Sequence, residues 1–98
     1  MAHTTVIRYT TRPEAADLNA RLVEEVFAEI SAAAPDGLRY TTYRLGDGTE
    51  FIHVLVSEGE GNPLGAFPAF RRFQEGIGER CADGPRFSPA AVVGAYGR

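Results

Sequence analysis

Residues 38–56, LRYTTYRLGDGTEFIHVLV, contain the pattern that decides the fold of this chain. Leu38–Leu45 alternates as a strand does, and Glu50–Val56 is rich in β-branched and aromatic side chains. Between them, Gly46-Asp47-Gly48 favours a tight turn. The stretch therefore predicts a β-hairpin.

A strand and an amphipathic helix are predicted before the hairpin. Thr4–Thr10 is β-branched and runs into Thr11-Arg12-Pro13-Glu14, which fits a Thr-x-x-Glu capping box at the start of a helix. The helix is expected over Ala15–Ala34 and ends at Pro35-Asp36-Gly37. Its apolar side chains recur every four residues at Leu18, Leu22, Val26 and Ile30.

A second helix and a last strand are predicted after the hairpin. Ser57–Asn62 is an acidic loop that contains glycine, and Pro63 or Pro68 can start the helix. Asp83-Gly84-Pro85 is expected to end the helix, and Ala90–Tyr96 (AAVVGAY) is the last predicted strand. The apolar stripe of this helix is expected to be Phe70, Phe73, Ile77 and Cys81.

The order of these elements is βαββαβ, and the 98 residues match one domain over positions 1–98. The prediction is a ferredoxin-like α+β fold, with a four-stranded antiparallel sheet and both helices on one face. In this arrangement we expect the first and third strands to lie parallel in the centre of the sheet.

Composition and charge exclude several classes of function. A net charge of −3 argues against nucleic acid, whose phosphates bind basic surfaces. A single cysteine, Cys81, forms no intrachain disulfide and suits a reducing compartment. The start of the chain lacks a signal-peptide pattern, and no stretch is apolar enough to span a membrane. We therefore expect a cytoplasmic protein that binds neither nucleic acid nor membrane.

Both faces of the predicted sheet are apolar. In the third strand Ile52, Val54 and Val56 share one face, while Phe51 and Leu55 share the other. Two helices cover one face only, so a second copy of the sheet is the economical cover for the other. The prediction is a homodimer, and the alternative is a monomer with a mildly apolar outer face.

The pattern resembles the antibiotic biosynthesis monooxygenase-like proteins of the dimeric α+β barrel superfamily over nearly the whole chain. The first strand runs into Arg12-Pro13-Glu14, the hairpin joins Tyr40–Tyr43 (YTTY) to His53–Val56 (HVLV), and the second helix starts at Phe67–Phe73 (FPAFRRF). The resemblance implies a pocket between sheet and helices that takes a small aromatic or polyketide-like substrate, sometimes without a cofactor. We expect no cofactor and no metal. The Asn, Trp and His constellation of better-understood relatives is incomplete here, because the chain has no tryptophan.

Three residues are the candidate catalytic groups. His53 lies within a predicted strand and has an ordinary pKa of about 6.5, which suits a base near neutrality. The alternative is a histidine packed in the core or at a dimer interface, since the face of the strand that carries it is undetermined. Asn19 falls on the apolar arc of the first helix, where its amide either lines a polar pocket or bonds nearby backbone. Tyr40 is chosen from the four tyrosines as a donor to a substrate oxygen.

Two glycines, Gly76 and Gly78, lie inside the second predicted helix and weaken it relative to alanine. They indicate either a close approach by another group or a kink.

Two hypotheses about function remain. The first is an oxygenase-like or isomerase-like enzyme that uses His53, Asn19 and a tyrosine on a small cyclic substrate. The second is a non-catalytic homodimer that binds a small molecule or serves in a stress response. An enzyme should have a cavity of about 300 Å³ or more with converging polar groups, whereas a structural dimer can fill that space with phenylalanine side chains.

Overall fold

The computed structural model describes residues 2–58 and 63–97, and its elements follow the predicted order. Residues 59–62 of the predicted Ser57–Asn62 loop lie outside the described residues, and Ser57 belongs to a strand. No helix in the described ranges is long and apolar enough to cross a membrane. The elements are β1 (Ala2–Thr11), α1 (Ala16–Ala33), β2 (Leu38–Leu45), β3 (Glu50–Glu58), α2 (Pro68–Glu75), α3 (Ile77–Arg80) and β4 (Cys81–Ala90), with short 3-10 helices at Pro13–Ala15 and Pro63–Ala66.

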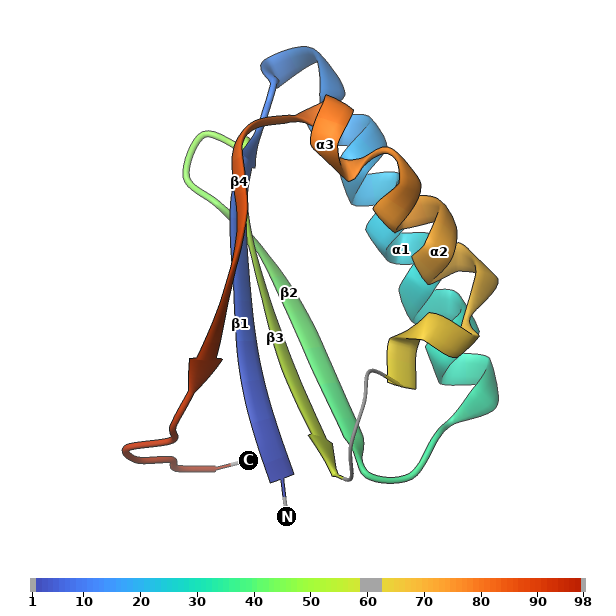
Figure 1. The fold of residues 1–98 in the computed structure, drawn as a ribbon, viewed down its shortest axis with the longest axis vertical. Helices are drawn as coiled ribbons and strands as arrows, with labels where there is room; N and C mark the ends of the chain where they lie inside the picture. Colours follow the sequence, from blue (N-terminus) through green and yellow to red (C-terminus); the bar gives the residue numbers. More distant parts are fainter. Residues whose placement is uncertain (1, 59–62, 98) are drawn as a thin grey trace.

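The four strands form one sheet in the order β2-β3-β1-β4, and every neighbouring pair is antiparallel. The expectation that the first and third strands run parallel is wrong. Helix α1 returns the chain so that β2 has the direction of β1, and the hairpin then reverses the chain into β3. Both α1 and α2 cover the same face of the sheet (Figure 1), which confirms the predicted ferredoxin-like α+β class.

The core lies between this sheet face and the helices. Aliphatic side chains of α1 and phenylalanines of α2 pack against aromatic and aliphatic side chains of the two central strands. The buried members of this cluster are Tyr9, Val23, Val26, Phe51, Leu55, Leu64, Ala69, Phe70 and Phe73. Its aromatic content matters for function because several of these rings also border the cavity described below.

The last strand is not where the sequence predicted it. β4 covers Cys81–Ala90, and residues 91–97 form no regular element. Asp83-Gly84-Pro85 therefore lies inside a strand, and Cys81 begins that strand instead of extending a helical stripe. Gly84, Pro85 and Pro89 are untypical of a strand, so the sequence pattern did not predict one here. Because β4 is an edge strand, the backbone donors that the prolines lack are tolerated.

Helix α1 buries most of the predicted stripe. Val26 is buried, and Leu22 and Ile30 are partly buried against the core, whereas Leu18 is 44% exposed. The fully buried residues of the helix are Ala16, Asn19, Val23 and Val26. The predicted capping box is also absent, because Arg12 precedes the first helical turn and the Thr11 hydroxyl donates to the carbonyl oxygen of Thr49.

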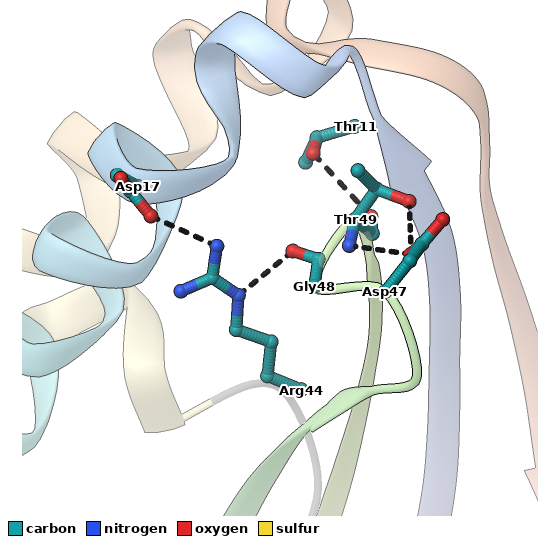
Figure 2. A network of polar contacts seen from close by, with 6 residues as sticks. All are labelled: Thr11, Asp17, Arg44, Asp47, Gly48 and Thr49. Carbon is teal, nitrogen blue, oxygen red and sulfur yellow. Dashed lines mark hydrogen bonds and ion pairs between the residues drawn. The ribbon is translucent and has the colours of Figure 1, made fainter.

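The tip of the hairpin is tied to the start of α1 through Arg44 (Figure 2). Its Nε donates to the Gly48 carbonyl at 2.7 Å and its Nη2 donates to Asp17 at 2.9 Å. The guanidinium also lies 5.6 Å from the ring centre of Phe51. These contacts hold the end of the β2–β3 pair against the helix layer.

In the described part of the chain, no helix lies on the opposite face of the sheet (Figure 1). Ile52, Val54 and Val56 point to this face and are partly exposed, whereas Phe51, His53 and Leu55 alternate with them and are buried under the helices. The predicted division of β3 into two apolar faces is therefore present in the structure.

Candidate functional site

A cavity of about 220 Å³ lies between the sheet and the helix layer. It is smaller than the 300 Å³ or so that we took as the mark of an enzyme pocket. Aromatic and aliphatic side chains form most of its wall, and the phenylalanines do not fill it. The lining residues are His3, Thr5, Ile7, Tyr9, Tyr40, His53, Leu55, Ser57, Leu64, Phe70, Phe73, Gln74, Ile77, Pro85 and Phe87.

His53 faces this cavity and is only 2% exposed. Its Nε2 lies 2.7 Å from the hydroxyl oxygen of Tyr9, and its Nδ1 lies 2.6 Å from the hydroxyl oxygen of Tyr40. The Thr42 hydroxyl is 3.1 Å from the same Nδ1. Both ring nitrogens of His53 are thus within hydrogen-bond distance of hydroxyl groups. The sequence did not determine which face of the sheet carries His53, and the structure places it on the face that borders the cavity.

Strand register explains why these side chains meet. His53 pairs with Ile7 of β1 and with Thr42 of β2. Tyr9 and Tyr40 are each two residues away from those partners on the same sheet face, so they are diagonal neighbours of His53, within reach of a long aromatic side chain. Three adjacent strands therefore bring Tyr9, His53 and Tyr40 together.

Asn19 is fully buried behind Tyr9. Its Nδ2 donates to the Tyr9 hydroxyl oxygen at 2.9 Å, and its Oδ1 accepts from Nε of Arg80 at 3.0 Å. Neither of the two expected roles describes it, because the amide is outside the set of cavity-lining residues and its partners are side chains. Asn19 links Tyr9 to Arg80.

Arg80 is a functional candidate that sequence reasoning missed. It is 7% exposed, its Nη2 donates to the Phe73 carbonyl at 2.6 Å, and the guanidinium lies 5.1 Å from the Phe73 ring centre. Among the described residues no carboxylate forms an ion pair with it.

Gly76 is the signal in the sequence that could have pointed to Arg80. A Cβ at Gly76 would lie 2.8 Å from Nη1 of Arg80, so the glycine leaves room for the guanidinium. The helix also breaks at Gly76, between α2 and α3. Both expected meanings of this glycine, a close approach and an interruption of the helix, are therefore present.

The hydroxyl groups of Tyr9 and Tyr40 and the imidazole of His53 are uncharged at neutral pH. Burial lowers the pKa of His53 to about 4 and raises the pKa of Tyr40 to about 12, against a smaller lowering by a hydrogen bond from Thr42. Burial also raises the pKa of Tyr9 well above its usual range, although the hydrogen bond from Asn19 acts in the opposite direction. Among the described residues, the one charged group hydrogen-bonded to this chain of side chains is the guanidinium of Arg80.

The remaining sequence candidates are dispersed. Tyr43 is 53% exposed and Tyr96 is fully exposed beyond β4, so neither joins the site. Gln74 and His3 also line the cavity. Within residues 2–58 and 63–97 no three His, Cys, Asp or Glu side chains are placed to share a metal ion.

The fold and the site together define a small α+β protein of ferredoxin-like type with an apolar cavity and a buried chain of hydroxyl, imidazole and amide groups at its wall. No family model and no curated protein matches the sequence.

Solved structures match over almost the whole chain. Rv0793 from Mycobacterium tuberculosis has 18% identity and a TM-score of 0.76, with 99% of this chain and 100% of that chain covered. A Bacteroides thetaiotaomicron protein, described provisionally as an antibiotic biosynthesis monooxygenase, has 14% identity and a TM-score of 0.80, with 94% and 90% covered. Another antibiotic biosynthesis monooxygenase has 18% identity and a TM-score of 0.66, with 96% and 100% covered.

These matches show the fold. The resemblance found in the sequence is thereby confirmed at the level of architecture, and three of the proteins with this architecture are described, two of them provisionally, as antibiotic biosynthesis monooxygenases.

Proposed function

We propose that this chain binds a small phenolic or quinol compound in the 220 Å³ cavity and promotes its oxidation by molecular oxygen. The observation that carries the proposal is the row of Tyr9, His53 and Tyr40 at the wall of a cavity whose other lining side chains are mostly aromatic or aliphatic. Phenylalanine and isoleucine side chains suit the rings of such a substrate, and the hydroxyl groups suit its oxygen atoms. The descriptions of the structural neighbours agree with this chemistry.

A quinol is a suitable substrate because it can supply all the electrons. In the proposed reaction a hydroquinone and O₂ give a hydroxyquinone and water. One oxygen atom enters the ring, the other leaves as water, and the four electrons that reduce O₂ come from the quinol. The reaction therefore needs no separate reductant, in keeping with our expectation that no cofactor is required.

The role that fits His53 best is a hydrogen-bonded link between two tyrosines. With a pKa of about 4, the imidazole is a weak base at neutral pH, since an efficient general base has a pKa near the working pH. Held between Tyr9 and Tyr40, the ring instead orients the hydroxyl groups that meet the substrate. Asn19 acts behind them by holding Tyr9.

The proposal includes a homodimer formed through the uncovered sheet face. Ile52, Val54 and Val56 place an apolar stripe on that face, and Val6 lies beside Val54 in the register. A second copy would bury this stripe, which is costly to leave in water. The dimer is expected to be the unit that binds the substrate.

Oxygen uptake by the purified protein tests the catalytic proposal. A panel of phenols and hydroquinones is supplied without added metal or flavin, and wild type is compared with His53→Ala and with Tyr43→Phe as an exposed control. We expect uptake by wild type and by the control and a loss of at least tenfold in His53→Ala, after circular dichroism has shown that the variant folds. Absence of uptake by wild type over the whole panel would count against oxidation, and unchanged uptake in His53→Ala would remove His53 from the site.

The second candidate function is binding without catalysis. It is favoured by the same low pKa of His53 and by a cavity smaller than the expected enzyme pocket. Calorimetric titration with the same panel separates the two candidates. Binding without oxygen uptake supports the binding protein, whereas turnover supports the enzyme.

A further inference from the structure

We infer that Arg80 is a positioning residue which, acting through Asn19, Tyr9 and His53, turns the Tyr40 hydroxyl into a hydrogen-bond donor and makes the cavity prefer the anionic form of a phenolic ligand. The inference rests on the proposed function and adds which ionisation state of the ligand the site selects.

The direction of the hydrogen bonds starts at Arg80, because a guanidinium can donate and cannot accept. Its Nε therefore faces the oxygen of the Asn19 amide, at 3.0 Å. The amide nitrogen of Asn19 must then point the other way, and it donates to the Tyr9 hydroxyl oxygen at 2.9 Å. Asn19 is fully buried, so bulk solvent does not reach either end of the amide.

The same direction continues through His53. The oxygen of Tyr9 accepts from Asn19 and also lies 2.7 Å from Nε2 of His53. Because Nε2 is the acceptor that lies within reach of the buried Tyr9 hydroxyl, we assign this second hydrogen bond as one that Tyr9 donates. A neutral imidazole that accepts at Nε2 carries its hydrogen on Nδ1. That hydrogen is donated to the Tyr40 oxygen, which lies 2.6 Å from Nδ1.

Tyr40 is the end of the chain of donors. Its oxygen accepts from His53 and also from the Thr42 hydroxyl, whose hydrogen bond lowers the pKa of Tyr40 against the effect of burial. The hydrogen of Tyr40 is left to point into the cavity, which Tyr40 lines. A ligand oxygen at this position meets a donor, and an oxyanion is the strongest acceptor that can occupy it.

The charge of Arg80 acts in the same sense as this geometry. The cation is buried, and no carboxylate among the described residues neutralises it. The titratable groups around it and along the chain are Tyr9, Tyr40, His53 and Cys81, and burial keeps each of them uncharged at neutral pH. Successive hydrogen bonds from a cation polarise one another toward the ligand.

A nitrophenol tests the preference without any turnover, because its phenolate absorbs visible light and its phenol does not. The pKa of bound 4-nitrophenol is measured by absorbance for wild type, Arg80→Met and Arg71→Met. Arg71 is an exposed arginine on α2, so Arg71→Met is the matched control. We expect wild type and Arg71→Met to favour the phenolate by on the order of tenfold, about one pKa unit.

In Arg80→Met the preference for the phenolate should be lost, so that phenol and phenolate bind with equal affinity. If Arg80 only supports the structure, both forms lose affinity together and their ratio stays unchanged. An unchanged ratio in Arg80→Met overturns the inference, and so does a wild type that binds no nitrophenol or has no preference for its anion. Failure of oxygen uptake would instead remove the oxidation reaction and leave this result standing.

Asn19→Asp provides a second test if Arg80→Met does not fold. A carboxylate gives the buried Arg80 an ion-pair partner and accepts from the Tyr9 hydroxyl, so it reverses the direction of hydrogen bonding. We expect ¹⁵N NMR to show the Nδ1–H tautomer of His53 in wild type and the Nε2–H tautomer in Asn19→Asp, with loss of phenolate preference in the variant. The same tautomer in both proteins would overturn the inference.

Discussion

The Nε2 atom of His53 lies 2.7 Å from the hydroxyl oxygen of Tyr9, although 44 positions separate the two residues in the chain. Tyr9 is 3% exposed and His53 is 2% exposed, and their rings are tilted against each other at 5.3 Å between centres. Because both groups are neutral, the pair depends on the hydrogen bond and on ring packing. If either side chain is removed, the atom of the other that faced it stays buried and loses this hydrogen bond.

Replacement of Tyr9 by phenylalanine should therefore destabilise the protein by roughly 1–3 kcal/mol, the usual cost of stranding a buried polar group. The substitution removes the acceptor of Asn19 and the donor to His53 in one step. Urea unfolding measures the change, and Tyr43→Phe on the exposed face is the control. Equal stability of the two variants would contradict the buried hydrogen-bond chain.

Acid should destabilise the fold through His53. Its pKa is about 4 in the folded protein and 6.5 ordinarily, so between these values the unfolded chain binds the proton more readily. The free energy of unfolding therefore decreases as the pH is lowered from about 6.5 to about 4, and the complete decrease, reached below both pKa values, is roughly 3 kcal/mol. Urea unfolding at pH 7.5 and 4.5 measures the loss. His53→Gln, which does not titrate, should be less stable at pH 7.5 but lose less between the two values, and an equal loss would contradict the assignment.

Alanine at the two glycines of the second helical region should have opposite effects. Gly78→Ala places a methyl group in open space on α3 and should add about 0.5–1 kcal/mol of stability. Gly76→Ala places it 2.8 Å from Nη1 of Arg80 and should displace the guanidinium from Asn19, with a net loss of stability. Thermal melts of the two variants check this, and a stabilised Gly76→Ala would show that Arg80 moves freely.

A charge on the uncovered sheet face should separate the subunits. Val54→Asp places a carboxylate in the middle of the apolar stripe of β3, where a partner sheet is proposed to pack. Sedimentation equilibrium should give a dimer for wild type and for Glu24→Ala, an exposed change on α1, and a monomer for Val54→Asp. A wild type that is monomeric at high micromolar concentration would contradict the dimer.

Part of the site could be predicted from local pattern. The hairpin placed His53 on a strand, and helical periodicity placed Asn19 on the buried arc of α1, where it is fully buried. The side of the sheet that His53 faces could not be predicted, because β3 is apolar on both faces and alternation alone does not say which set meets the helices.

Arg80 and β4 escaped prediction for different physical reasons. An arginine at the end of a helix usually lies in water, and its burial here depends on contacts with Asn19 and with the Phe73 carbonyl that only the tertiary fold provides. In β4, Gly84 and Pro85 have the composition of a turn, whereas in the structure they lie at a register shift between the Arg8–Arg86 and Thr10–Asp83 pairs, an irregularity that an edge strand tolerates. The apolar residues 90–96 were assigned to a strand in their place, and Val93 and Tyr96 are fully exposed there.

The five side chains of the buried hydrogen-bond chain come from five different elements, α1, β1, β2, β3 and α3. No single segment of the protein contains them all. A compound that binds beside Tyr40 therefore recognises only the completely folded state. By mass action, such a compound stabilises the whole protein by about 2.7 kcal/mol at one hundred times its dissociation constant. The melting temperature thus becomes a general detector of occupancy, and a library of small aromatic acids, phenols and quinones can be screened by thermal shift before any reaction is known.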